Sequence, residues 1–186
     1  MSGINYLYNQ KFQQLTRDKY PLKTIIHPEV KIGHIHLSVA DLERSLKFYR
    51  DLLGFEVTSY FGDSAVFLSA GGYHHHIGLN TWRGSNATPP PPGHTGLYHF
   101  AILFPSRLEL ARVLKKLYEV NYPLEGASDH GVSESIYLTD PDGNGVELYA
   151  DRILDQWPID EEGHLQMVTK HLDILDLLSE LDSEGS

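Results

Sequence analysis

Apolar and polar positions along residues 31–82 predict a strand, a helix and three further strands, in that order. Alternation over residues 32–39 indicates the first strand, and apolar positions at helical spacing indicate a helix over 42–53. Asp41 is a favourable N-cap for that helix, and Gly54 is a typical stop. Short apolar segments separated by Gly-Asp and Gly-Gly turns predict the remaining strands, over 55–60, 65–69 and 75–80.

Residues 96–152 repeat this βαβββ order. A strand is expected over 97–104, and Ser106 with Glu109 three residues later forms a capping box for the next helix. The apolar side of this helix consists of Leu110, Leu114, Leu117 and Tyr118. The three closing strands are expected over 124–127, 134–139 and 145–150. Identity between the two halves is low, so the repeat is one of pattern.

The repeat predicts one α+β domain over residues 31–152, built from two βαβββ modules, 31–82 and 96–152. A Pro-rich segment at 86–95 joins the modules as a stiff linker, because consecutive prolines favour an extended backbone. Two modules packed face to face would bring their first and fourth strands to one shared cleft, where we expect a metal.

The two ends of the chain lie outside the repeat. Residues 1–30 form an aperiodic, tyrosine-rich extension, to which no function is assigned. Residues 153–186 form an acidic tail, in which the spacing of Leu172, Leu175, Leu178 and Leu181 predicts an amphipathic helix over 167–181. This helix is expected either to cap the domain or to form a contact between copies of the chain, and a homo-oligomer is expected.

Composition narrows the class of protein. A hydrophobic content of 41% in 186 residues supports one compact domain, and the absence of cysteine excludes disulfides and thiolate metal sites. The net charge is −10, and residues 151–186 hold ten acidic against two basic side chains. This balance argues against nucleic acid, whose phosphates require a basic surface. No apolar run approaches the roughly 20 residues that span a bilayer, so a soluble, cytoplasmic protein is expected.

Histidines fall at equivalent points of the two modules. His34 precedes the N-cap Asp41 by seven residues. His99 precedes the N-cap Ser106 by the same number. Glu147 falls on the fourth strand of the second module between apolar neighbours, where a buried carboxylate needs a cation. Taken alone, each is an ordinary strand residue, but together His34, His99 and Glu147 form the two-histidine, one-carboxylate set that holds Fe(II) with open coordination positions.

Three consecutive histidines, His74 to His76, stand at the start of the expected fourth strand of the first module. The third, His76, corresponds to Glu147 in the repeat, so it is expected to reach the metal as a fourth ligand or as an acid/base group. A surface histidine patch is the alternative. His36 shares a strand face with His34. Its counterpart in the second module is Ala101, so it ranks below His34 as a ligand.

His130 and Tyr137 stand upstream of an Asp-Pro-Asp-Gly turn that starts at Asp140. An imidazole and a phenol near a metal can orient a substrate oxygen and move protons. Alternatively, Tyr137 is a core aromatic whose hydroxyl is bonded locally, and His130 is exposed on a loop. The turn itself is structural, because Pro and Gly favour a tight strand-to-strand connection.

These residues together resemble the vicinal oxygen chelate superfamily, which includes glyoxalases, fosfomycin-resistance proteins, bleomycin-binding proteins and extradiol ring-cleavage dioxygenases. The resemblance covers residues 31–152, two-thirds of the chain. Residues 33–49 are similar to the opening strand and helix of that fold, and residues 96–103 are similar to the opening of its second module.

The second half of the chain carries a narrower likeness. It matches the extradiol dioxygenase motif at His130, Ile136-Tyr137, Asp140-Pro141, Gly143 and Glu147. Ser128 departs from that motif, which prefers Gly, Asn, Thr or an aliphatic residue there. The pair His75-His76 is similar to a His-His pair whose second member is the acid/base catalyst. The chain therefore resembles catechol-2,3-dioxygenase-like extradiol enzymes, although the best-known of these have four modules and this chain has two.

The resemblance implies an enzyme that inserts O2 into a small aromatic diol at Fe(II), with Mn(II) as the alternative metal. It assigns metal binding to His34, His99 and Glu147. It assigns proton transfer to His76, and orientation of the bound oxygens to His130 and Tyr137. Two other functions stay open. A glyoxalase-like lyase or isomerase is disfavoured because His76 stands where such enzymes carry a carboxylate. A non-catalytic, drug-sequestering protein is disfavoured because the metal ligands are intact.

Overall fold

The computed structural model of the protein describes residues 26–85, 87–91 and 93–185. Most of the expected N-terminal extension, and positions 86 and 92 of the expected linker, lie outside these residues. The chain divides into two units, 1–33 and 34–186. In the described part of the first unit, the Val30 amide donates a hydrogen bond to the His27 carbonyl. The helices and strands of the described residues all lie in the second unit.

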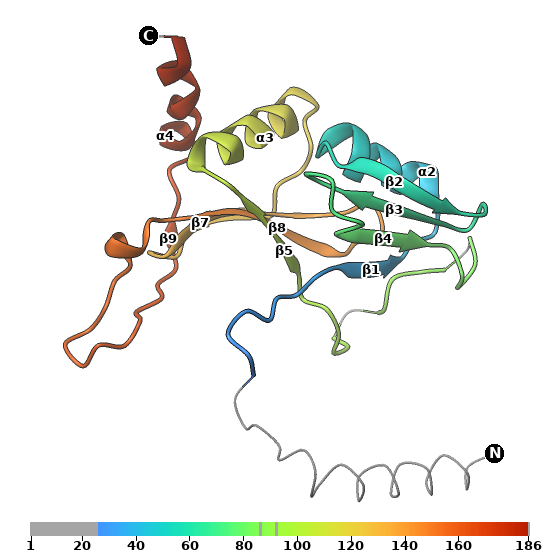
Figure 1. The fold of residues 1–186 in the computed structure, drawn as a ribbon. Helices are drawn as coiled ribbons and strands as arrows, with labels where there is room; N and C mark the ends of the chain where they lie inside the picture. Colours follow the sequence, from blue (N-terminus) through green and yellow to red (C-terminus); the bar gives the residue numbers. More distant parts are fainter. Residues whose placement is uncertain (1–25, 86, 92, 186) are drawn as a thin grey trace, which may run out of the picture. The chain divides into compact units, whose positions relative to one another are not determined.

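The first module folds into a four-stranded sheet with the order β1-β4-β3-β2 (Figure 1). Its strands are β1 (Ile35–Ser38), β2 (Glu56–Phe61), β3 (Ala65–Ser69) and β4 (Ile77–Asn80). β1 and β4 are parallel, and the other neighbours are antiparallel. Leu79 lies opposite both Leu37 and Val66, and all three are buried. This face is therefore the core face, and His36 lies on the opposite face of the sheet.

The second module folds into a five-stranded sheet with the order β5-β8-β7-β6-β9. Its strands are β5 (Phe100–Phe104), β6 (Gly126–Asp129), β7 (Ser133–Thr139), β8 (Gly145–Asp151) and β9 (Lys170–His171). β5 and β8 are parallel, as β1 and β4 are in the first module. The predicted fold class, α+β with two βαβββ modules, is confirmed, and β9 is an addition contributed by the tail.

The first helix begins where the sequence predicts, but it is not α-helical throughout. α2 (Leu42–Leu46) follows Asp41, whose side chain accepts a hydrogen bond from the Arg44 amide. Over Lys47–Leu52 the backbone continues as a π-helix. Gly54 follows with φ +89°, a left-handed conformation that glycine adopts without a Cβ clash, so the chain can turn into β2 there.

The second helix, α3 (Arg107–Glu119), follows Ser106, whose hydroxyl accepts a hydrogen bond from the Glu109 amide. This half of the capping box is confirmed, and the Glu109 carboxylate pairs with Arg112. The predicted apolar residues Leu110, Leu114 and Leu117 are fully buried. Tyr118 is 48% exposed in the last turn of α3, so the buried side is shorter than predicted.

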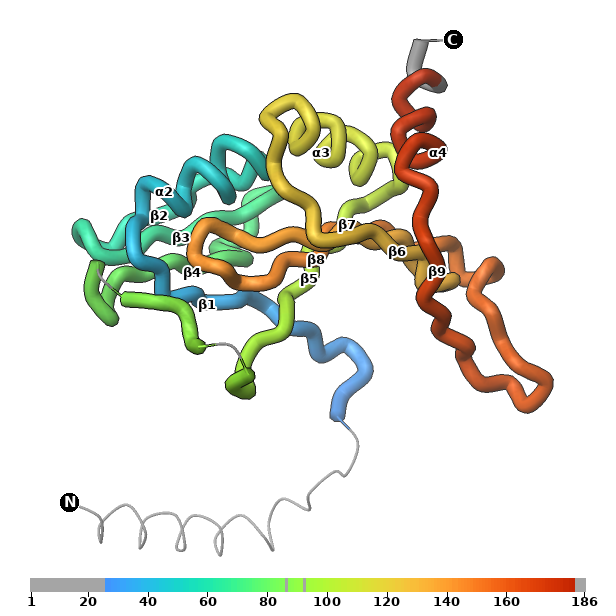
Figure 2. Tube along the Cα trace, turned by 180° about the vertical axis from the view of Figure 1, so that it is seen from behind, coloured from blue at the N-terminus to red at the C-terminus, as the bar shows by residue number. Residues whose placement is uncertain are grey.

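Both helices lie on the same side of the sheets, as two opposite views show (Figures 1 and 2). Buried apolar side chains from the two modules form one continuous core cluster. The sheet faces that carry His36 and Glu147 are turned away from this core. The described elements include no helix that is long and apolar enough to cross a membrane.

The Asp-Pro-Asp-Gly turn between β7 and β8 connects the second module to the helix of the first. Asp140 accepts a hydrogen bond of 2.7 Å from the buried Tyr49 hydroxyl. Asp142 accepts hydrogen bonds from the Ala40 amide, the Arg44 guanidinium and the Ser45 hydroxyl. Burial, together with the charge of Asp140, raises the pKa of Tyr49 well above its usual value. The turn is structural, as predicted, and it also holds the two modules together.

The acidic tail differs from its prediction. Leucine spacing predicts a helix over 167–181, but β9 lies within this range and pairs with β6. The helix α4 (Ile174–Ser179) begins only after its N-cap Asp173. Strand pairing satisfies the backbone groups that a longer helix would have used, so tertiary contact overrides the local pattern. Leu177 is fully buried, whereas Leu175 is 78% exposed.

Arg107, at the start of α3, anchors the tail to the second module. Its guanidinium bonds to the carboxylates of Glu134, Asp176 and Glu180. Glu134 is nearly buried and also pairs with Arg152. Burial opposes the charge on Arg107, but the three carboxylates outweigh burial and raise its pKa above the usual value. One guanidinium therefore fastens α4 to the sheet of the second module.

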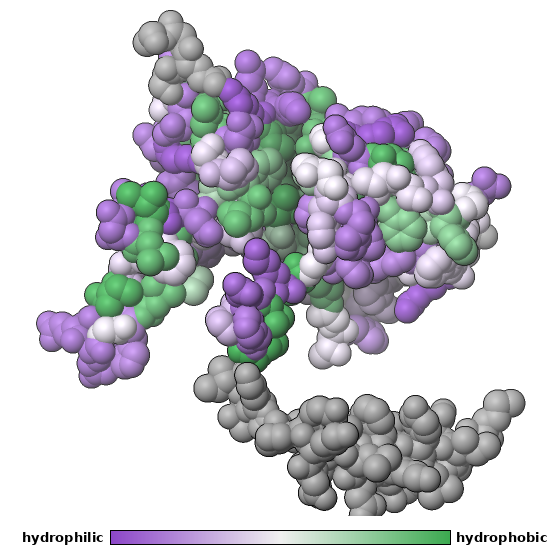
Figure 3. All heavy atoms as spheres, viewed as in Figure 1, coloured by the Kyte–Doolittle hydropathy of each residue, from purple (hydrophilic) through white to green (hydrophobic). Residues whose placement is uncertain are grey.

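The segment between β8 and β9 projects from the second sheet and contains a 3-10 turn (Leu154–Gln156). Apolar side chains are exposed on this segment, seen as green spheres at the lower left of Figure 3: Ile153, Leu154, Ile159, Leu165 and Met167. A second 3-10 turn (Glu180–Gly185) ends the described chain. The tail thus leaves the sheet, returns to it as β9 and ends beside α3.

Candidate active site

Two of the three predicted metal ligands are adjacent. His99 directly precedes β5, and Glu147 lies on β8, the parallel neighbour of β5. The Nε2 atom of His99 is 2.9 Å from the Oε2 atom of Glu147. The side chains are 32% and 13% exposed, so a small molecule can reach the pair although most of the carboxylate is covered.

A glycine allows His99 to take this position. Gly145 begins β8, and a Cβ atom on it would lie 2.2 Å from the carbonyl oxygen of Tyr98 and 3.0 Å from the Cβ atom of His99. A backbone carbonyl cannot rotate away from such an overlap. The close approach of the two strands at His99 therefore requires glycine at position 145.

Tyr137 lies directly opposite Glu147 in the register of β7 and β8, so the two side chains share a face. Its hydroxyl oxygen is 3.1 Å from Oε1 of Glu147 and 2.6 Å from Nε2 of His130. Burial, together with the negative charge of Glu147, raises the pKa of Tyr137. The hydroxyl therefore stays protonated at neutral pH, and two neighbours compete for its single proton.

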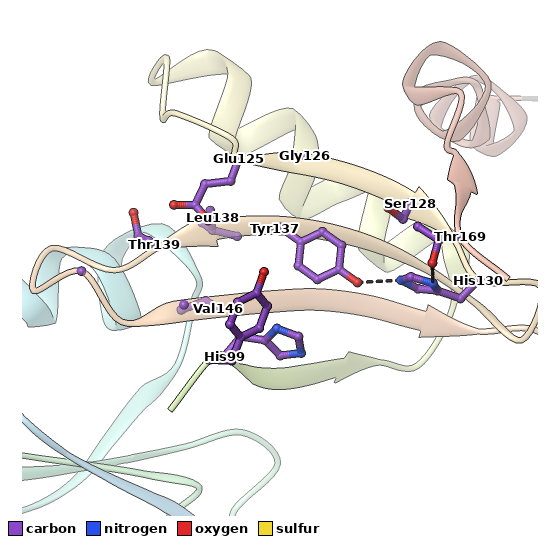
Figure 4. Close-up of a pocket in the computed structure, with 13 residues that line it drawn as sticks. His99, Glu125, Gly126, Ser128, His130, Tyr137, Leu138, Thr139, Val146 and Thr169 are labelled. Atoms are coloured by element: carbon purple, nitrogen blue, oxygen red, sulfur yellow. Dashed lines mark hydrogen bonds between the residues drawn. The ribbon is translucent and has the colours of Figure 1, made fainter. Parts of the chain in front are cut away.

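His99, Tyr137 and His130 border a hollow of about 640 Å³ on the open face of the second sheet (Figure 4). In the close-up, Tyr137 and His130 point toward one another, and the Thr169 hydroxyl lies beside the His130 ring. The lining residues belong to the second module, to the two residues that precede β5, and to the tail: Tyr98, His99, Glu125, Gly126, Ser128, His130, Tyr137, Leu138, Thr139, Gly143, Gly145, Val146 and Thr169.

The tail contributes two groups that the sequence pattern does not indicate. The Nδ1 atom of His130 is 2.8 Å from the carbonyl oxygen of Val168 and 3.5 Å from the hydroxyl of Thr169. Both residues reach the site only because β9 pairs with β6. His130 is therefore half-buried and bonded on both ring nitrogens, whereas the alternative reading makes it an exposed loop residue.

The predicted ligand His34 lies on the first module. It is exposed just before β1, and its ring centroid is 4.4 Å from that of His75. The Nδ1 atoms of His75 and His74 are 2.7 Å apart. Burial, with the charges of neighbouring histidines, lowers the pKa of His75. Within the described ranges, no three His, Cys, Asp or Glu side chains are grouped so that they could hold a metal ion. His34 as the third ligand stays a prediction.

His76 directly precedes β4 and is half-buried. Its Nδ1 atom accepts a hydrogen bond of 3.3 Å from the Ala70 amide and lies 3.0 Å from the Ser69 hydroxyl. Because an amide N–H can only donate, Nδ1 has no proton and the neutral ring holds its proton at Nε2. His36, which ranks below His34 as a ligand, instead packs near Trp82, with 5.4 Å between ring centroids.

The donor atoms at the pocket suit a divalent metal ion. The imidazole of His99 and the carboxylate of Glu147 converge at 2.9 Å, and both are ligand types that Fe(II) and Mn(II) accept. The other carboxylate oxygen of Glu147 is bonded to Tyr137, which fixes the orientation of the carboxylate. His99 and Glu147 therefore fit the role of two metal ligands.

Comparison with known proteins identifies the superfamily of the chain. The model of the Glyoxalase/Bleomycin resistance protein/Dioxygenase superfamily matches residues 31–148. The chain is 44% identical over 161 residues to a catechol-2,3-dioxygenase of Bacillus subtilis (strain 168), covering 87% of this chain and 55% of that protein. It is 31% identical over 121 residues to biphenyl-2,3-diol 1,2-dioxygenase 3 of Rhodococcus globerulus, covering 65% and 63%. The chain thus spans between half and two thirds of the length of these two relatives.

A solved structure agrees at the level of the fold. The glyoxalase/dioxygenase from Nostoc punctiforme superposes with a TM-score of 0.59, covering 70% of this chain and 99% of that one. The identity is 20%, so this likeness concerns the fold alone. It supports the two-module architecture that the strand order defines.

Proposed function

This chain belongs to the glyoxalase/bleomycin resistance protein/dioxygenase superfamily, and we propose that within it the chain is an extradiol ring-cleavage dioxygenase acting on a catechol-type aromatic diol. The observation that carries the proposal is that His99, Tyr137 and His130 line one pocket, and that Glu147 contacts both His99 and Tyr137. The names of the two aligned relatives, both dioxygenases of aromatic diols, support the same reaction class.

In this proposal, His34, His99 and Glu147 hold Fe(II), with Mn(II) as the other candidate. When bound, the metal supplies the redox chemistry that allows an aromatic diol to react with O2. His99 and Glu147 already lie together, whereas His34 belongs to the other sheet. The contribution of His34 is therefore tested separately from that of the other two ligands.

Tyr137 and His130 bind and orient the diol. The hollow beside them, about 640 Å³, is large enough for a single aromatic ring with its two oxygens. A diol oxygen bound near Glu147 would lie within reach of the Tyr137 hydroxyl. His130, at 2.6 Å from that hydroxyl, can take its proton and return it. The pair can therefore accept the proton that the diol oxygen must lose, because Tyr137 takes up that proton while passing its own to Nε2 of His130.

His76 acts as the acid/base group in this proposal. The Ala70 amide keeps Nδ1 of His76 as an acceptor, so the proton available for transfer is the one at Nε2. Imidazole is the side chain best suited to proton transfer near neutral pH. This role is separable from metal binding, because substitution of His76 would lower turnover without changing the amount of bound iron.

The test is anaerobic loading of the full chain with Fe(II), followed by catechol and O2. We expect oxygen uptake and a yellow ring-fission product. His99→Ala and Glu147→Ala should lose both bound iron and activity, and His34→Ala should do the same if it is the third ligand. His164→Ala is the control, because His164 is exposed on the projecting segment. Iron and activity that persist in His99→Ala or Glu147→Ala would overturn the assignment.

The same assay separates the other functions of the superfamily. A glyoxalase-like lyase would convert a hemithioacetal with Zn(II) or Ni(II) and would consume no O2. A drug-sequestering protein would bind an aromatic ligand and turn over neither substrate. Metal analysis of protein purified without chelators adds an independent reading, because iron or manganese supports the dioxygenase and zinc or nickel supports the lyase.

A further inference from the structure

The tail contacts His130 through the backbone of a single residue. The Val168 amide donates a hydrogen bond of 3.1 Å to the carbonyl oxygen of His130. The Val168 carbonyl oxygen lies 2.8 Å from Nδ1 of the same histidine. β9 pairs with β6 just beyond this point, so the contact continues a strand pairing. Val168 therefore holds both the backbone and the ring of His130.

The contact determines which nitrogen of His130 has a proton. A carbonyl oxygen can only accept a hydrogen bond, so Nδ1 must be protonated. The neutral ring then has its lone pair at Nε2, which is 2.6 Å from the Tyr137 hydroxyl. In the opposite tautomer, the Nδ1 lone pair would face the Val168 carbonyl, and the two would repel. The geometry therefore leaves Nε2 as the ring nitrogen that can accept a proton from Tyr137, whose hydroxyl also donates to Oε1 of Glu147.

The tail is closely packed at this point. Gly131 has φ +76°, and a Cβ atom on it would lie 3.0 Å from Pro158 and 3.3 Å from the Val168 side chain. Because residue 131 is glycine, Pro158 and Val168 of the tail can lie beside it. The Val168 side chain lies beside Gly131, whereas the Val168 backbone is held by its hydrogen bond to His130 and by the strand pairing that follows.

We propose that Val168 is a positioning residue whose backbone carbonyl fixes the tautomer of His130 and so makes Nε2 the proton acceptor for Tyr137. The role of that acceptor in turnover rests on the proposed function, but the tautomer itself does not. The proposal gives a function to a part of the chain beyond residues 31–148, which the superfamily model matches.

The test is long-range 1H–15N NMR of histidine rings in the metal-free, full-length chain at neutral pH. The His130 signals are assigned by their loss in His130→Gln. We expect the resonance of a protonated Nδ1 and an unprotonated Nε2 in the unaltered chain. Val168→Pro removes the amide that bonds to the His130 carbonyl, and the protonated-Nδ1 pattern should be lost. Val168→Ala keeps both backbone groups and is the matched control, in which the pattern should persist.

Two outcomes would overturn the proposal. One is a proton on Nε2 of His130 in the unaltered chain, a result that needs no variant to fold. The other is an unchanged His130 pattern in a folded Val168→Pro protein. With Fe(II) and catechol, Val168→Pro should lower kcat about 10- to 100-fold with little change in KM. An unaltered chain without oxygen uptake would refute the proposed function while leaving the NMR result valid.

Discussion

Asp140 accepts a hydrogen bond of 2.7 Å from the hydroxyl of Tyr49, whose side chain is fully buried. This bond joins the turn of the second module to the helix of the first. A hydrogen bond to a charged acceptor contributes about 1.5–3 kcal/mol. Tyr49→Phe should therefore lower the free energy of unfolding by about that amount in urea denaturation. Tyr60→Phe, at a residue that is 58% exposed, is the control and should change it by less than about 0.5 kcal/mol.

Stability should fall at alkaline pH because the buried Tyr49 and the partly buried Tyr122 resist ionisation. Burial, with the charge of Asp140, raises the pKa of Tyr122 from 10.0 to about 12, and burial also raises that of Tyr49. The folded chain thus keeps protons that the unfolded chain releases, so this stabilisation is complete below pH 10 and declines toward pH 12. Unfolding midpoints measured across this window should decrease, less steeply in Tyr122→Phe. A flat profile in the unaltered chain would contradict the prediction.

Removal of Arg107 should release the tail. Arg107→Leu leaves Glu134, which is 6% exposed, with one cation fewer, and removes the hydrogen bonds of Arg107 to Asp176 and Glu180. Breaking a buried pair costs about 3 kcal/mol, and hydrogen exchange in α4 should accelerate. Lys115→Ala is the control, because its pair with Glu119 is about 60% exposed on both sides and such pairs contribute less than about 1 kcal/mol. Equal exchange rates in α4 of both variants would argue against the anchor.

Gly145→Ala should weaken metal binding without touching a ligand. The added Cβ atom overlaps the Tyr98 carbonyl and must displace His99 from Glu147. Displacement of a ligand from its supported position typically lowers metal affinity about 10- to 100-fold, which titration with Fe(II) or Mn(II) would measure. Gly96→Ala is the matched control, because a Cβ atom there meets nothing within 4 Å. Equal affinities in the two variants would show that the contact at Gly145 does not control His99.

His76→Gln should separate proton transfer from metal binding. Loss of a general acid or base typically lowers turnover about 10²- to 10⁴-fold, while iron content should equal that of the unaltered chain. Loss of iron together with activity would make His76 a ligand instead. Unchanged turnover would show that His76 is not the acid/base group. It would then be one member of the histidine cluster beside Tyr73, whose ring centroid is 4.9 Å from that of His76.

The part of the site on the second sheet follows from local pattern. Side chains two residues apart share a strand face, and the register of antiparallel neighbours brings Tyr137 opposite Glu147. The repeat places His99 at the start of the strand beside them. These three positions were predictable because strand period and repeat spacing determine them. The position of His34 relative to them depends on how two sheets pack, which strand spacing does not define.

The contribution of the tail was not predictable in the same way. Leucines at helical spacing favour a helix through Val168, yet the backbone there pairs as an extension of β9 with β6. That pairing depends on an edge of a sheet formed by residues some forty positions earlier in the chain. Val168 also acts through its carbonyl, which every residue possesses, so its side chain gives no indication of the role.

The helix α4 is connected to His130 through Arg107 and through β9. A pull on α4 acts on Arg107 and, through β9, on the carbonyl that orients His130. A handle that anchors the chain after residue 186 and is placed under load would apply such a pull. Protein held there should still take up metal but turn over more slowly than free protein. The position of an anchoring tag should therefore affect the measured kcat.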